Sequence, residues 1–149
     1  MIGNSRLHIL LRNGRTLSDV VAWYEVMDSK SMKDLIIKLV TRDQLFDRGI
    51  DSEGNVIGYY SYMTEIISGG EKQQGDHYTL LDSGDMFDSL FVAIFVNEFV
   101  IIGDTAKIEN QDWYTDKILK LTDENVQKVR EEAIPKFRNY LTATLFRTL

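Results

Sequence analysis

Two short apolar runs with a two-residue connection constrain the fold of this chain more than any other feature. Residues 90–96 and 99–102 are rich in Val, Ile and Phe, and Asn97-Glu98 stands between them. β-branched and aromatic residues favour extended backbone, and a two-residue connection is typical of an antiparallel hairpin. Both runs are far shorter than the roughly 20 apolar residues of a membrane-spanning helix. The sequence therefore predicts a β-hairpin in the middle of the chain.

Two helices are expected before the hairpin. Thr16 is a suitable N-cap for a helix that begins at Leu17, and Ser29 or Ser31 is suitable for the next one. The second helix has apolar residues at the three-four spacing of an amphipathic helix. These residues are Met32, Leu35, Ile36, Leu39, Val40 and Phe46. We expect this helix to pack into the core.

Two further helices are expected after the hairpin. Gln111 or Asp112 is suited to begin a short helix, and Thr122 to cap a long one. The apolar residues of the long helix are Val126, Val129, Ala133, Phe137, Tyr140, Leu141 and Leu145. Pro135 falls among these positions. Because proline lacks an amide hydrogen, we expect it to kink or divide the helix near residues 133–134.

The segment between the second helix and the hairpin contains few long regular elements. Residues 49–58 predict a turn in which Gly54 supplies a positive φ. A short helix is expected at 61–67, a mobile surface loop at 68–76 and a short strand at 77–81. Taken together, the elements predict an α+β fold: a small antiparallel β-sheet with a hairpin, flanked by N-terminal helices and a long C-terminal helix.

The composition supports a single domain over residues 1–149 and excludes several classes of function. The chain is 44% apolar, contains no cysteine and has only two histidines, His8 and His77. Disulfides, thiolate zinc sites and cysteine nucleophiles are therefore excluded. The formal charge of −6 disfavours a sequence-reading DNA-binding domain, which is usually basic. The N-terminal residues lack the continuous apolar core of a signal peptide.

Acidic residues are concentrated in one part of the chain. Residues 51–104 contain ten acidic residues and one basic residue, Lys72, which gives a local net charge of −9, while the rest of the chain carries +3. One interpretation is a surface that repels nucleic acid or docks on a basic partner. The other, which we favour, is a solvated face with carboxylates that stabilise turns.

Three of these acids have a spacing that is typical of one helical face. Asp82, Asp85 and Asp88 could hold a divalent cation through oxygen ligands. The favoured interpretation is that they cap a short helix and complement its dipole, because no further ligand set is fixed by spacing. No phosphate-binding glycine motif occurs either. We therefore predict no catalytic residue, no cofactor-binding residue and no metal ligand, and expect that the protein is not an enzyme.

Two motifs in a fixed order resemble a known family. The first is Leu45-Phe46-Asp47-Arg48-Gly49-Ile50-Asp51-Ser52-Glu53-Gly54-Asn55-Val56-Ile57-Gly58-Tyr59-Tyr60-Ser61, and the second is Leu80-Leu81-Asp82-Ser83-Gly84-Asp85-Met86-Phe87-Asp88-Ser89. The hairpin and a Leu-Thr-Asp-Glu-Asn helix start follow them. This pattern, over about residues 32–130, resembles the neck, head–tail connector and tail-completion proteins of tailed phages, including crass-like and other Bacteroidales phages.

The resemblance implies a structural virion protein that is assembled in the host cytoplasm. It implies a ring of copies in the neck or upper tail, which contacts portal, adaptor or tail proteins and no membrane. Phage DNA passes through such a ring without sequence-specific binding, and an acidic channel face favours that passage. We expect the loop at 68–76 and the two termini to contact neighbouring subunits. The alternative is an acidic cytoplasmic protein that inhibits a DNA-binding host enzyme.

Overall fold

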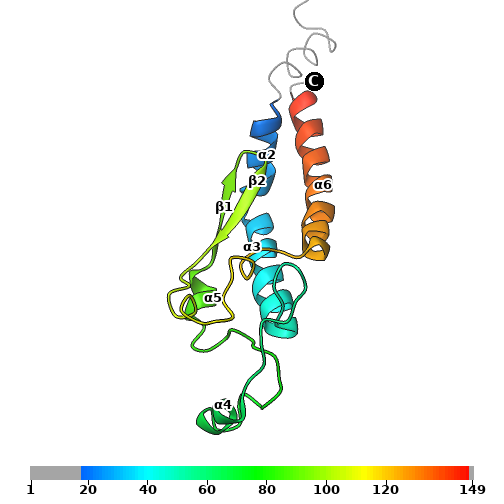
Figure 1. Cartoon of the computed structure of the whole chain (residues 1–149). Helices are drawn as coiled ribbons and strands as arrows, with labels where there is room; N and C mark the ends of the chain where they lie inside the picture. Colours follow the sequence, from blue (N-terminus) through cyan, green and yellow to red (C-terminus); the bar gives the residue numbers. More distant parts are fainter. Residues whose placement is uncertain (1–17, 148–149) are drawn as a thin grey trace, which may run out of the picture.

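The computed structural model describes residues 18–147 and has the predicted α+β fold (Figure 1). Its elements, in chain order, are α2 (Asp19–Met27), α3 (Lys30–Lys38), the π-helix η1 (Leu39–Arg48), α4 (Tyr62–Ile67), α5 (Asp85–Ser89), β1 (Phe91–Phe95), β2 (Glu98–Ile102) and α6 (Asp123–Leu145). Helix α2, the hairpin and α6 lie side by side, whereas α4 stands at the opposite end of the molecule. The predicted cap Thr16 and helix start Leu17 lie outside the described residues.

The hairpin forms as predicted, with its turn one residue earlier. Strands β1 and β2 pair antiparallel with Phe91 opposite Ile102 and Phe95 opposite Glu98. The connection is therefore Val96-Asn97, and Glu98 belongs to the second strand. Asn97 has a φ of +64°, a conformation that asparagine tolerates better than glutamate does. Because this turn position needs a left-handed backbone conformation, the register that places Asn97 there is favoured.

The core lies where the inner face of the hairpin meets the helices. Val92 and Ile101, which are opposite one another, are both buried on that face. The helices α3 and η1 contribute Met32, Ile36, Leu39, Val40 and Leu45, and α6 contributes Val129 and Ala133. The predicted helical spacing after Ser29 is confirmed, since four of its six apolar positions are buried, Leu35 packs against the core at its edge, and Phe46 is half-buried.

Two predicted elements are absent from the described residues. No strand occurs at 77–81: Tyr59 and His77 form only an isolated bridge, and Leu80 takes a φ of +54° that interrupts extended backbone. No helix occurs at 111–121, where successive turns follow one another. In these turns the amides of Tyr114 and Ile118 donate to carbonyls only three residues earlier, instead of four residues earlier as in an α-helix. The predicted strand and the predicted short helix were both wrong.

The long C-terminal helix is confirmed, but the predicted break at Pro135 is not. The hydroxyl of Thr122 accepts a hydrogen bond from the Asn125 amide at 3.2 Å, as expected of an N-cap. The helix runs as one element from Asp123 to Leu145. Pro135 is exposed, so the carbonyl that loses its partner faces water. Among the described residues, no helix is both long and apolar enough to cross a membrane.

A polar cluster joins η1 to the start of α6. The Asp43 carboxylate accepts hydrogen bonds from Arg48 at 2.6 Å and from the Asn125 side-chain amide at 2.9 Å. Arg48 also pairs with Glu124 at 3.2 Å. Partial burial opposes ionisation of Asp43, but the hydrogen bonds from Asn125 and Arg48 outweigh it and lower the pKa below its ordinary value of 3.8. The ionised carboxylate therefore stabilises this junction.

This junction makes the stability of the fold depend on pH. Because the pKa of Asp43 is lower in the folded chain than in the unfolded chain, its contribution is complete above the unfolded pKa and is lost as the pH falls through the folded pKa. We expect the free energy of unfolding, measured in urea between about pH 6 and pH 3, to fall less steeply in Asp43→Asn than in the wild type. Asp34→Asn is the control, because Asp34 forms only an exposed ion pair with Lys30. Equal slopes for all three proteins would contradict the prediction.

Candidate interaction surface

A projecting segment, residues 59–76, forms the most distinctive surface of the molecule, and we call it the arm. It leaves the body after η1 and carries α4 at its tip (Figure 1). Main-chain hydrogen bonds close its base: the Tyr60 amide donates to the Asp76 carbonyl at 2.8 Å, and the Gly75 amide to the Tyr60 carbonyl at 3.0 Å. The two ends of the arm are thereby held together.

The arm also has an ordered interior. Ser61 caps α4 by accepting a hydrogen bond from the Thr64 amide at 3.3 Å. Within the loop predicted at 68–76, the Ser68 hydroxyl accepts from the Lys72 amide at 3.0 Å, and the Glu65 carboxylate accepts from the Gln74 amide at 2.8 Å. The first bond closes a turn within the loop and the second ties the end of the loop to α4, so that the loop folds back on the helix.

The tip of the arm presents apolar side chains to solvent. All residues of helix α4 lie within the described part of the chain, and none of them is buried. The exposed fractions of its large apolar residues are 60% for Tyr62, 62% for Met63, 56% for Ile66 and 79% for Ile67. An isolated helix of six residues is not stable in water by itself. Clustered apolar residues on an ordered projection are typical of a surface that another molecule covers. The arm therefore has the properties of a preformed docking element.

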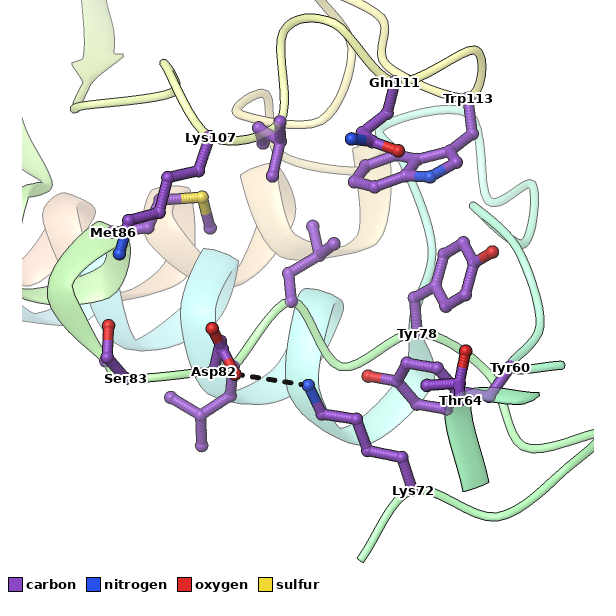
Figure 2. Close-up of a pocket in the computed structure, with 14 residues that line it drawn as sticks. Tyr60, Thr64, Lys72, Tyr78, Asp82, Ser83, Met86, Lys107, Gln111 and Trp113 are labelled. Carbon is purple, nitrogen blue, oxygen red and sulfur yellow. Dashed lines mark hydrogen bonds and ion pairs between the residues drawn. The ribbon is translucent and has the colours of Figure 1, made fainter. Parts of the chain in front are cut away.

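A pocket of about 400 Å³ lies beside the base of the arm (Figure 2). Three aromatic rings follow one another on one side of it: the Tyr60 and Tyr78 ring centroids are 5.0 Å apart, and those of Tyr78 and Trp113 are 5.3 Å apart. Such tilted pairs stabilise the packing of the rings. On the other side, Lys72 reaches across to Asp82 at 3.5 Å. The residues that line the pocket thus link the arm to the body through aromatic packing and one ion pair.

The three aspartates with helical spacing do not converge on one point. Asp85 and Asp88 lie in the first turn of α5, as the favoured interpretation predicted. The Asp85 carboxylate accepts from the Ser83 hydroxyl at 2.6 Å and pairs with Lys107 at 3.1 Å, contacts that lower its pKa in that order of importance. Asp82 is directed to Lys72 instead. Within residues 18–147 no group of three or more potential metal ligands occurs.

The acidic stretch at 51–104 receives lysines from outside its own sequence. Lys107 pairs with Asp85, and Lys117 pairs with Glu53 at 2.8 Å. The hydrogen bond that the Lys117 ammonium donates to Glu53 is the main cause of the raised pKa of Lys117. Asp51 has a structural role, because its carboxylate accepts from the amides of Glu53 and Asn55 in the turn. Folding therefore offsets part of the −9 charge, and some of the carboxylates stabilise turns.

Sequence reasoning found the aromatic part of this surface and missed the aliphatic part. The acidic stretch contains a set of aromatic residues, and because stacking on nucleic acid needs basic neighbours, its sequence favours a role in the core or in a protein interface for Tyr59, Tyr60, Tyr62, Phe87, Phe91, Phe95 and Phe99. Tyr59 and Tyr62 are exposed on the arm, and Phe91 and Phe95 are exposed on the outer face of the hairpin. Met63, Ile66 and Ile67 were not singled out. The sequence pattern that could have indicated them is a short apolar helix next to a glycine-rich polar loop, with no adjacent element to cover the helix.

Comparisons with known proteins do not extend this picture. No protein-family model, curated protein or solved structure matches the chain. The interaction surface is therefore characterised by its own residues: an ordered apolar tip, a closed base and an aromatic pocket that joins the base to the body. This arrangement is suited to holding a rigid projection against another protein.

Proposed function

We propose that this protein is a structural virion protein of a tailed phage, which forms part of the neck or upper tail between portal and tail. In this proposal it assembles as a ring of identical copies that contacts portal, adaptor or tail proteins. DNA passes through the ring without sequence-specific binding. The proposal rests on the resemblance of residues 45–61 and 80–89 to connector and tail-completion proteins.

The observation that carries the proposal is the arm. In a ring, each subunit covers a surface of its neighbour, and a rigid apolar projection can provide one side of that contact. The arm supplies such a projection, because its base is closed by main-chain hydrogen bonds and its tip exposes Met63, Ile66 and Ile67.

Mass spectrometry of density-purified phage particles tests the proposal. We expect the chain to co-purify with the major capsid protein at a fixed ratio, at a few to a few dozen copies per particle. That copy number also gives the symmetry of the ring. If the chain is abundant in the lysate but absent from particles, the proposal is wrong. The alternative, an acidic protein that inhibits a DNA-binding host enzyme, is then favoured.

A further inference from the structure

Apart from the arm and the single residues Val56 and Leu81, three surfaces of the described chain expose large apolar side chains. They are the outer face of the hairpin, the exposed side of α2 and the second half of α6. Representative residues, in that order, are Phe91 and Ile102, Val21 and Tyr24, and Ile134 and Leu141. Because all three surfaces expose such side chains, apolar character alone does not distinguish between them.

Charge distinguishes the three surfaces. The only charged residue of the hairpin is Glu98, and those of α2 are Asp19 and Glu25. Residues 133–147, the second half of α6 and the two residues after it, carry Lys136, Arg138 and Arg147 and no acidic residue, although Lys136 pairs with Glu132 of the preceding turn at 3.4 Å. The arm has the opposite sign, because residues 59–76 contain three acidic residues and one lysine, a net charge of −2. Of the three surfaces, only that of α6 is electrostatically complementary to the arm.

The α6 surface is continuous with an apolar groove. The groove, of about 420 Å³, lies between α2, the hairpin and α6. Trp23, Phe99, Ile134 and Phe137 line it, together with one acidic and one basic side chain, Glu98 and Arg130, whose charges balance. Ile134 belongs both to the groove and to the exposed surface of α6. A short apolar helix with aliphatic side chains has the chemical character that this lining favours.

The arm and the groove of one chain lie too far apart to meet. Figure 1 shows α4 at one end of the molecule and α2, the hairpin and α6 at the other. Contact between the two surfaces must therefore join different copies. Because the two surfaces differ, each copy offers one of each. A two-fold axis gives a dimer with two reciprocal contacts, whereas another closing rotation gives a larger head-to-tail ring, which is the arrangement that the proposed function needs.

We infer that the arm of one copy docks on the second half of α6 of a second copy, with Ile66 and Ile67 entering the groove beside Ile134. This inference rests on the proposed function in one respect, the ring, and it names the contact that builds the ring. Apolar burial at the tip of the arm supplies the stabilisation, while the opposite charges of arm and α6 favour this surface over the hairpin and α2.

Sedimentation velocity of the full chain, with two single variants and their mixture, tests the inference. Ile67→Asp disables the arm and leaves the groove intact, whereas Ile134→Asp disables the groove and leaves the arm intact. We expect the wild type to sediment as a species larger than a dimer and each variant alone as a monomer. An equimolar mixture of the variants is expected to form a 1:1 dimer and nothing larger, because only one intact contact remains. A misfolded variant would not restore this dimer.

Val100→Asp is the matched control, because Val100 is 39% exposed on the outer face of the hairpin and Ile134 is 42% exposed on α6. We expect it to assemble like the wild type. The inference is overturned if the wild type stays monomeric at its solubility limit, if Ile134→Asp still assembles, or if Val100→Asp is the variant that dissociates. In those cases the presence of the chain in purified particles still decides the proposed function independently.

Discussion

Gln44→Leu will lower the free energy of unfolding by about 3 kcal/mol, a large share of the 5–15 kcal/mol of a typical domain. Gln44 is fully buried in η1. Its amide nitrogen donates to the Lys120 carbonyl at 2.7 Å, and its carbonyl oxygen accepts from the Thr122 amide at 3.0 Å. Leucine fills the space but leaves both backbone groups without a partner, and each buried group of this kind costs about 1–3 kcal/mol. Urea unfolding followed by tryptophan fluorescence measures the loss.

Two further variants separate the lost hydrogen bonds from the substitution itself. Gln73→Leu makes the same change at an exposed position of the arm and is expected to alter stability by less than about 0.5 kcal/mol. Gln44→Glu keeps an acceptor for Thr122 but places a buried carboxylate against the Lys120 carbonyl. Its folded pKa is therefore expected to rise above the unfolded value, so that its deficit relative to the wild type grows as the pH increases. A Gln44→Leu protein as stable as Gln73→Leu would contradict the role of this side chain.

The elements that sequence reasoning predicted correctly are those whose signals are local. The N-cap Thr122 and the apolar spacing after it determine α6, and neither depends on distant residues. The hairpin follows from two β-favouring runs with a short connection, and even its register error has a local cause in the left-handed backbone of Asn97. The exposed position of Pro135 could not be read from the sequence, and it explains why the helix continues.

The elements that were predicted wrongly depend on tertiary contacts. Residues 111–121 have helix-like apolar spacing, yet they form successive turns. These turns bury Ile118 in the core and at the same time pack Trp113 against Tyr78. At 77–81 the aromatic and β-branched residues favour a strand, but Tyr78 packs against Gly58 and Leu80 adopts a left-handed conformation. Tertiary packing outweighs local preference at both sites.

The candidate interaction surface was only partly predictable for a related reason. The sequence predicts a helix at 61–67 and a polar loop after it, and the structure confirms the helix. It does not indicate that no other element covers Ile66 and Ile67, because that depends on how the main-chain bonds at Tyr60 and Gly75 direct the arm away from the body. Exposure is a property of the whole fold, so the exposed apolar tip of the arm becomes visible only in three dimensions.

Gly49→Ala will destabilise the fold by about 2–4 kcal/mol and loosen the junction between η1 and the arm. Gly49 ends η1 with a φ of +60°. An added methyl group would lie 2.3 Å from the ring of His77 and 2.7 Å from the carbonyl oxygen of Tyr78, both beside the base of the arm. The ring cannot move freely, because His77 Nε2 hydrogen-bonds the Phe46 carbonyl at 3.0 Å. The substitution therefore adds a steric clash to the backbone strain.

Gly54→Ala isolates the backbone strain, because Gly54 has a φ of +82° but no atom within 4 Å of an added methyl group. We expect this control to cost only about 1–2 kcal/mol, the penalty of left-handed backbone without a clash. The difference between the two variants in urea unfolding measures the contact with His77 and Tyr78. Adding His77→Ala to Gly49→Ala should recover part of the loss, because it removes the nearest obstacle. Equal losses for Gly49→Ala and Gly54→Ala would mean that the base of the arm moves aside at little cost, and that the arm is less rigidly attached to η1 than its contacts indicate.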